Sequence, residues 1–178
     1  MTVAELKALI RSVPDFPQPG ILFRDVTTLF GDGAGFAEAV AMIAESAESV
    51  GARAIAGIEA RGFILGGAVS ARLSLPFLPV RKPGKLPVPV LAIDYALEYG
   101  TDRLEIDPGA VAAGQRVVVV DDLIATGGTA SAAVALLRRA GATVDHACFL
   151  IDLPDLGGAD RLRDAGVEAW ALMDFPGH

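Results

Sequence analysis

Cysteine is almost absent from this chain, which contains one such residue among 178. A single cysteine excludes a disulfide framework within the chain, and the apolar neighbours of Cys148 favour a buried strand thiol over a nucleophile. Long hydrophobic runs are absent as well, since no stretch approaches the roughly 18 apolar residues that a membrane helix requires. The chain also does not open with a basic segment followed by an apolar one. We therefore expect a cytoplasmic protein that does not associate with membranes.

Basic residues are in the minority. Lysine and arginine number 15 against 22 aspartates and glutamates, a formal net charge of −7, and this argues against nonspecific nucleic-acid binding. Basic residues are unevenly distributed along the chain, because residues 61–85 contain five of them and no acidic residue. Such a sector can simply be a solvated face, but an anionic substrate would require one.

Hydrophobic residues make up 52% of the chain, enough for one compact domain over residues 1–178. Helical and strand patterns alternate along it. We expect helices over residues 3–12, 36–50, 63–73 and 130–140, and strands over residues 54–58, 77–80, 116–120, 144–151 and 167–172. This alternation predicts an α/β fold with a mostly parallel central sheet, helices on both faces, and ligands at the carboxyl ends of the strands.

Residues 81–108 interrupt the alternation. Their first part is too rich in proline and glycine for a regular element, whereas residues 88–94 and 103–106 can pair as a hairpin. Excursions of this length from compact domains are commonly lids or binding loops. A disordered linker is the alternative, but no second domain follows for it to join.

The most informative stretch runs from Val117 to Thr129. A β-branched strand ends in Asp121 and Asp122, and a glycine and hydroxyl loop then opens a helix, which is an arrangement that binds phosphate through backbone N–H groups. The loop comprises Ala125, Thr126, Gly127, Gly128 and Thr129. Ionised carboxylates only accept hydrogen bonds, so the acidic pair suits a polyol or a metal beside that phosphate. Together these groups predict a ribose 5-phosphate site.

Other interpretations of this stretch are a helix cap at Thr129, a magnesium site of a nucleotide triphosphatase, and a phosphorylated receiver domain. The triphosphatase is disfavoured because the chain has no G-x-x-x-x-G-K-[ST] motif. The order of strand, acidic pair and A-T-G-G-T loop instead resembles the phosphoribosyl pyrophosphate signature of type I phosphoribosyltransferases.

Further stretches narrow the resemblance to the adenine-specific members of that family, in order and spacing across nearly the whole chain. They are Asp15-Phe16-Pro17, Pro19-Gly20, Phe23-Arg24-Asp25, Glu59-Ala60-Arg61-Gly62-Phe63, Arg81 to Pro87, Leu97 to Asp102, and Phe175 to His178. One departure is Ala96, where many members have Ser or Asp. The resemblance implies a type I phosphoribosyltransferase fold with a hood (about residues 13–32) and a flexible lid (about residues 81–108).

The implied reaction is the salvage of adenine: adenine and 5-phosphoribosyl 1-pyrophosphate give AMP and pyrophosphate, with Mg²⁺ held mainly by substrate oxygens and water and by no dedicated protein ligands. By resemblance, Asp121 and Asp122 hold the ribose hydroxyls and residues 125–129 hold the 5-phosphate. The pyrophosphate contacts are Arg61, Arg81, Lys82 and Lys85. Arg61 would follow a turn with a non-proline cis peptide near Ala60-Arg61, and Arg81 would act from the neighbouring subunit of a homodimer.

The same resemblance assigns adenine to the hood. Phe23 would stack on the base, Leu22 and Arg24 would offer backbone groups to its edge, and Leu153 would pack on its other side. On the lid, Glu98 would handle a proton of the adenine imidazole ring, and Tyr99 would shape the closed lid.

Three alternatives remain. The first is a phosphoribosyltransferase for another base, although hypoxanthine-guanine and orotate enzymes generally lack the hood and lid motifs seen here. The second is a regulator that binds phosphoribosyl pyrophosphate without turnover, which typically carries a DNA-binding domain. The third is a ribose-phosphate pyrophosphokinase-like protein, which would need a longer chain. An assay with several bases separates them.

Overall fold

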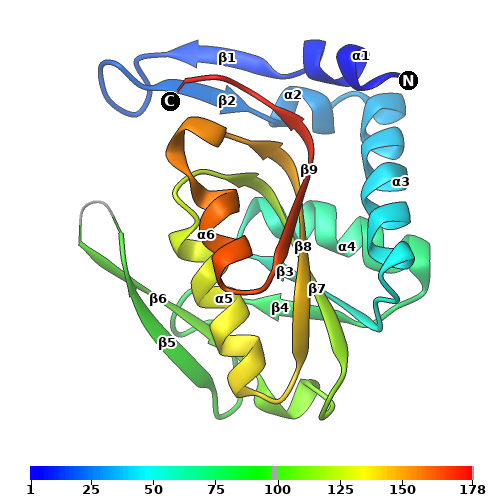
Figure 1. Cartoon of the computed structure of the whole chain (residues 1–178), viewed down its shortest axis with the longest axis vertical. Coiled ribbons are helices and arrows are strands. Elements are labelled where there is room, and N and C mark those ends of the chain that lie inside the picture. Colours follow the sequence, from blue (N-terminus) through cyan, green and yellow to red (C-terminus); the bar gives the residue numbers. More distant parts are fainter. Residues whose placement is uncertain (98–99, 178) are drawn as a thin grey trace.

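A five-stranded parallel sheet forms the centre of the protein in the computed structural model, which describes residues 1–97 and 100–177. The strands are β3 (Ala54–Ile58), β4 (Phe77–Val80), β7 (Arg116–Ile124), β8 (Thr143–Asp152) and β9 (Glu168–Asp174), in the order β4-β3-β7-β8-β9 (Figure 1). All four pairings between neighbouring strands are parallel. This confirms the predicted α/β class.

The valine run of β7 explains its central place. Val117 to Val120 are each 0% exposed, and burying such a side chain stabilises the fold by about 1.5–3 kcal/mol. Their alternate side chains enter two cores on opposite faces of the sheet. This is the pattern expected of a parallel strand that is covered on both sides.

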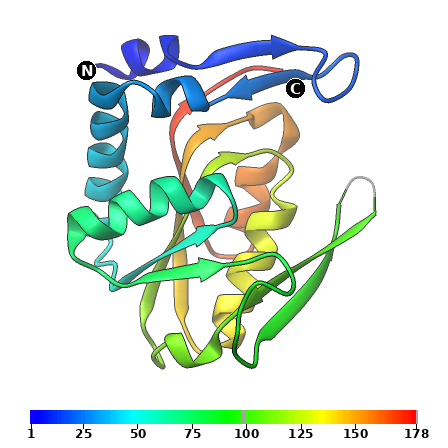
Figure 2. The same ribbon diagram turned by 180° about the vertical axis from the view of Figure 1, so that it is seen from behind.

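Helices cover both faces (Figure 2). The helices α3 (Gly33–Ser49) and α4 (Arg61–Leu73) pack on one face, and α5 (Gly128–Arg139) and α6 (Gly158–Asp164) pack on the other. Two short 3-10 turns also occur: η1 (Pro108–Ala110) lies between β6 and β7, and η2 (Pro154–Leu156) lies between β8 and α6. The short helix α6 was not predicted, because its seven residues are too few to show a clear period.

Two antiparallel hairpins lie outside the sheet. The hood contains β1 (Arg11–Pro14) and β2 (Leu22–Asp25), flanked by α1 (Val3–Ala8) and α2 (Thr27–Phe30), and the C-terminal tail returns to it. The lid contains β5 (Leu91–Ala96) and β6 (Thr101–Ile106), which run beside α5 (Figure 1).

The expected helix over residues 3–12 was wrong beyond Ala8, because its last residues pair with β2 as strand β1. The first lid strand likewise begins three residues later than predicted, at Leu91.

The order of the strands places a crevice at a defined position. The chain passes from β3 outward to β4 and then back across β3 to β7, so β3 and β7 are neighbours whose following helices lie on opposite faces. Ligands of open α/β sheets bind at such a switch point, beyond the carboxyl ends of the strands.

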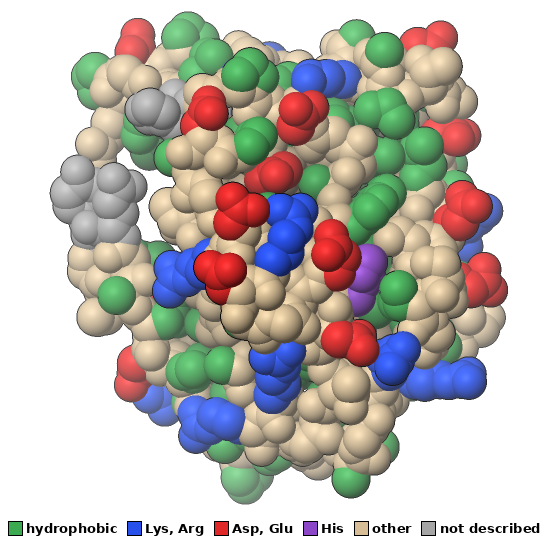
Figure 3. Space-filling view, viewed as in Figure 1, with side chains coloured by type: hydrophobic (Ala, Val, Ile, Leu, Met, Phe, Trp, Pro, Cys, Tyr) green, Lys and Arg blue, Asp and Glu red, His purple; other side chains and the backbone are tan. Residues whose placement is uncertain are grey.

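Acidic and basic side chains are interspersed over the face of the molecule in Figure 3. Among the helices described, none is both long and apolar enough to cross a membrane.

Candidate active site

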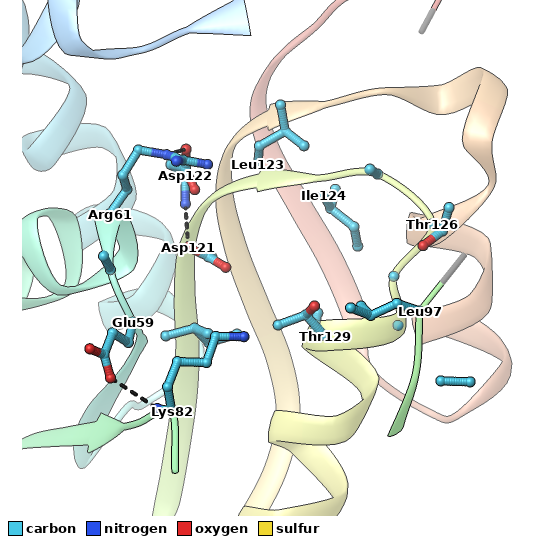
Figure 4. A pocket seen from close by; sticks show the side chains of 17 residues that line it. Glu59, Arg61, Lys82, Leu97, Asp121, Asp122, Leu123, Ile124, Thr126 and Thr129 are labelled. Carbon is cyan, nitrogen blue, oxygen red and sulfur yellow. Dashed lines mark hydrogen bonds and ion pairs between the residues drawn. The ribbon is translucent and has the colours of Figure 1, made fainter. Parts of the chain in front are cut away.

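A pocket of about 310 Å³ opens at this switch point. Its walls come from the turn after β3, the end of β7, the loop that opens α5, and the lid (Figure 4). Nine of the predicted site residues line it, namely Arg61, Lys82, Asp121, Asp122, Ala125, Thr126, Gly127, Gly128 and Thr129. Residues far apart in the sequence therefore meet in one place.

The glycine loop has the geometry of an anion site. Gly127 adopts a left-handed backbone conformation with φ 77° and caps α5, which begins at Gly128. The first N–H groups of a helix lack partners within the helix and carry the positive end of its dipole. Thr126 is exposed at the rim, and Thr129 lies in the first turn of α5. The loop can therefore bind a phosphate with its backbone and two hydroxyls.

The acidic pair is not symmetrical. Asp122 is buried and forms an ion pair with Arg61, in which Nε lies 2.5 Å from Oδ2. Asp121 is half-buried as a residue, and its Oδ1 accepts the backbone N–H of Asp122 at 2.9 Å. Burial of the carboxyl group, and then the charge of Asp122, raise the pKa of Asp121 well above its usual range. The protonated form of Asp121 is therefore favoured relative to an ordinary aspartate, whereas Asp122 is the member of the pair that contacts Arg61.

Glu59 ties the turn after β3 to the start of the lid. Its carboxylate accepts the backbone N–H of Lys82 at 2.9 Å and the Nε–H of Arg81 at 3.3 Å. These two contacts, the Lys82 N–H first, lower the pKa of Glu59. The non-proline cis peptide expected near Ala60-Arg61 lies one bond earlier, between Glu59 and Ala60.

Lys82 joins the lid to the pocket. Its ammonium group forms an ion pair with Asp102 and donates to the Tyr95 hydroxyl at 3.2 Å. Burial, the largest single influence, lowers the pKa of Lys82, but the hydrogen bonds to Asp102 and Tyr95 and the charge of Asp102 together outweigh it, so the pKa is raised. The hydroxyls of Tyr95 and Thr129 are 3.4 Å apart, a long contact between the lid and the phosphate loop.

Several predicted residues lie outside this pocket. Arg81 pairs with Glu59 and donates to the Lys85 carbonyl oxygen, and neither basic residue lines the pocket of its own chain. The Arg24 side chain turns toward the tail, donating to the Pro176 carbonyl oxygen at 3.2 Å. Leu22 pairs with Pro14 in the hood hairpin. Leu153 is buried at the end of β8, and Glu98 and Tyr99 lie outside the described residues.

Phe23 lines a second, more apolar cavity under the hood, together with Val13, Phe16, Asp25, Val26, Thr27 and Arg61. Phe16 and Phe23 meet edge to face, with ring centroids 5.1 Å apart. Arg61 lines both cavities, so the two adjoin. A flat apolar ligand under the hood would therefore sit next to whatever occupies the main pocket.

The sequence did not predict the contributions of Glu59, Tyr95 and Asp102. Glu59 and Asp102 each lie in a stretch that resembles the family, but the resemblance assigns neither a role. In the structure Tyr95 lies opposite Asp102 in the lid hairpin, one pair beyond the predicted strands over residues 88–94 and 103–106, so the pairing of the two could not be predicted.

The carboxylates of the pocket suit a magnesium ion that arrives on its substrate. Within residues 1–97 and 100–177, no group of three or more His, Cys, Asp or Glu side chains could hold a metal ion. Mg²⁺ is commonly bound by one or two carboxylates together with substrate phosphates and water. Asp121 and Asp122 can supply that small share, and Asp122 is already paired with Arg61.

Known proteins match the chain over its full length. The family described as "Phosphoribosyl transferase domain" matches residues 32–168. The adenine phosphoribosyltransferase of Novosphingobium aromaticivorans is 66% identical over 178 residues, 100% of both chains. The crystal structure of the enzyme of that name from Thermoanaerobacter pseudethanolicus is 46% identical, with a TM-score of 0.92 over 98% of this chain and 100% of that one. The Giardia lamblia enzyme, solved with 9-deazaadenine, is 31% identical, with a TM-score of 0.93 over 100% of this chain and 99% of that one.

Proposed function

This chain belongs to the adenine phosphoribosyltransferase family, and from that premise we propose how its residues share the work of the reaction. The reaction transfers the 5-phosphoribosyl group of 5-phosphoribosyl 1-pyrophosphate to adenine and yields AMP and pyrophosphate. The observation that carries the assignment is the acidic pair at the end of β7, followed at once by the loop that opens α5. A cytoplasmic location for this salvage reaction stays a prediction.

The ribose 5-phosphate lies along the end of β7. Residues 125–129 hold the 5-phosphate with backbone N–H groups at the positive end of α5. Asp121 and Asp122 accept hydrogen bonds from the ribose hydroxyls. As the bond from C1′ to the pyrophosphate oxygen breaks, positive charge develops on the ribose, and two nearby carboxylates stabilise it.

The leaving pyrophosphate lies between β3 and the lid. Arg61 and Lys82 face the pocket from these two sides and stabilise the departing anion. Mg²⁺, when bound through the substrate oxygens, neutralises further charge there. Arg81 and Lys85 extend the basic surface beyond the pocket of their own chain.

Adenine lies in the cavity under the hood, where Phe23 offers a face for stacking and the backbone groups of Leu22 and Arg24 contact the edge of the base. The solved Giardia lamblia relative holds 9-deazaadenine, a base of the same size and shape as adenine. Leu153 packs on the other side. Glu98 takes a proton from the imidazole ring as the base attacks C1′, and Tyr99 shapes the closed lid.

A two-fold dimer completes the site, with Arg81 of one subunit reaching the pyrophosphate of the other. Its exclusion from the pocket of its own chain supports this arrangement. Arg81→Ala and Asp122→Asn should each retain only a small fraction, about a tenth or less, of the wild-type activity when tested alone. When the two are refolded together, random pairing should restore about a quarter of the sites. No recovery of AMP formation in verified mixed dimers would place the action of Arg81 within its own chain.

The decisive assay offers adenine, hypoxanthine, guanine, xanthine and orotate in turn, with phosphoribosyl pyrophosphate and Mg²⁺. Adenine alone should react. Turnover of another base would contradict the assignment of adenine as the substrate. Binding of phosphoribosyl pyrophosphate without turnover of any base would indicate a regulator. Asp121→Asn and Asp122→Asn should each lower kcat/KM for phosphoribosyl pyrophosphate about 10- to 100-fold, the loss of a charged hydrogen bond, with the far-UV circular dichroism spectrum unchanged. Normal kinetics in both variants would contradict the ribose assignment.

A further inference from the structure

The phosphate loop rests directly on the first turn of α6. Gly127 of the loop and Gly158 of α6 approach so closely that neither leaves room for a side chain. A Cβ atom on Gly158 would lie 2.3 Å from the Ala125 carbonyl oxygen, 2.7 Å from the Gly127 nitrogen and 2.8 Å from Ile124 Cγ1. A Cβ on Gly127 would lie 2.9 Å from the Gly158 carbonyl oxygen. Contacts below 3.0 Å with backbone atoms require the backbone to move.

Hydrogen bonds fix the same two segments together. The Gly158 N–H donates to the Ala125 carbonyl oxygen at 3.0 Å, and the Leu153 N–H donates to the Ile124 carbonyl oxygen at 3.0 Å. Residues 153–158 thus run beside residues 124–127 and are joined to them by backbone hydrogen bonds. Leu156 packs this supporting segment against the core.

This support determines where the loop's N–H groups point. The site for an anion is made of backbone donors, so a shift of a few tenths of an ångström in Ala125 or Gly127 changes every donor distance at once. Gly158 itself does not line the pocket. Its effect on a ligand would therefore pass through the loop.

We propose that Gly158 is a positioning residue for the 5-phosphate: its missing side chain allows α6 to hold residues 125–127 in the shape that binds that group. The proposal rests on the assignment of residues 125–129 to the 5-phosphate. It predicts a selective defect. Ligands that carry the 5-phosphate lose affinity when Gly158 gains a methyl group, and ligands without it do not.

The test compares AMP with adenosine, which differ only in the 5-phosphate, by isothermal titration calorimetry on the full-length protein. The Kd of adenosine divided by the Kd of AMP measures how much the 5-phosphate contributes to binding. Gly158→Ala should reduce this ratio at least tenfold while the Kd of adenosine stays within about twofold of wild type, and KM for phosphoribosyl pyrophosphate should rise with KM for adenine unchanged. The matched control is Gly67→Ala, because a Cβ there meets nothing within 4 Å. It should leave the ratio unchanged.

Leu156→Ala supplies a second test that adds no clash, and so covers the case in which Gly158→Ala does not fold. By loosening the supporting segment it should reduce the ratio several-fold. An unchanged ratio in the folded variants would overturn the proposal, as would an equal loss of adenosine affinity, since that indicates general damage. Failure of wild type itself to distinguish AMP from adenosine would instead overturn the assignment of the phosphate loop.

Discussion

The hood and the lid are both two-stranded antiparallel hairpins outside the central sheet, but they are held in different ways. The hood continues directly into buried residues, with Val26 and Leu29 only 1% and 0% exposed. A carboxylate of the hood, Asp25, is itself buried, bonded to Arg11 and to the Thr27 hydroxyl. The lid has an apolar base, where Leu104 and Ile106 are 0% and 2% exposed, but ion pairs and Leu97, 44% exposed, occupy its outer part.

This difference separates the tasks of the two hairpins. A hairpin that continues directly into buried residues suits a rigid, flat, uncharged ligand, whose site must be preformed. A hairpin fixed by partly exposed ion pairs can exchange those pairs for the charges of a phosphate at small cost, because such pairs contribute about 0–1 kcal/mol. Lid substitutions should therefore alter turnover and phosphoribosyl pyrophosphate binding, and hood substitutions should alter adenine binding and stability.

The largest effect should come from the lid residue Glu98. Removing its charge in Glu98→Gln should lower kcat by about 10²–10⁴-fold, the contribution typical of a general acid or base, while the Kd of phosphoribosyl pyrophosphate changes little. Single-turnover kinetics on rapidly mixed enzyme and substrates measure the chemical step. The control is Asp94→Asn, an exposed lid carboxylate paired with Arg103, which should be nearly silent. An unchanged chemical step in Glu98→Gln would remove Glu98 from the mechanism.

In the hood, Phe23→Ala should raise KM for adenine about tenfold, within the roughly 1–3 kcal/mol that stacking of a base on an aromatic ring contributes. KM for phosphoribosyl pyrophosphate should stay within about twofold. Phe23→Tyr keeps the ring and should restore the wild-type value. The Phe23 ring centroid lies 6.0 Å from Arg61 Cζ. A parallel rise in both KM values would therefore mean that the ring shapes the whole site through Arg61, and not only the adenine cavity.

The sequence was most informative where one segment carries both the pattern and the chemistry. The valine run, Asp121 and Asp122, and the glycine loop all lie within residues 117–129, so the lining of the pocket at this end of β7 could be predicted from the sequence, while the roles of these residues stay predictions. The strand β1 could not, because its pairing partner lies beyond a proline-rich connector and no period of its own distinguishes it from the end of a helix. The contacts of Asp102 and Gly158 depend on segments brought together only by folding.

A smaller effect should follow from Tyr95→Phe, which removes the hydroxyl between Lys82 and Thr129. The contact of this hydroxyl with Thr129 in the phosphate loop is a neutral hydrogen bond, which contributes about 0.5–1.5 kcal/mol, so KM for phosphoribosyl pyrophosphate should rise about two- to tenfold. KM for adenine should not change. Steady-state kinetics with each substrate varied in turn separate these outcomes. A rise confined to KM for adenine would contradict the proposed division of tasks between lid and hood.

The smallest effect on turnover should come from Asp25→Asn in the hood, where the consequence is pH-dependent stability. The Thr27 hydroxyl, and then Arg11, lower the pKa of Asp25 to about 2 from an ordinary 3.8. A lowered pKa in the folded state stabilises the protein above the ordinary value, and this stabilisation disappears as the pH falls through about 4 to about 2. Urea unfolding should therefore show wild type more stable than Asp25→Asn by about 1–2 kcal/mol at pH 7, with the gap closing toward pH 2.5. Asp164→Asn, at an exposed carboxylate outside the hood, is the control and should show no such closing gap. A constant gap in Asp25→Asn would mean that the hood is held by packing alone, and that its buried carboxylate does not contribute as an ion.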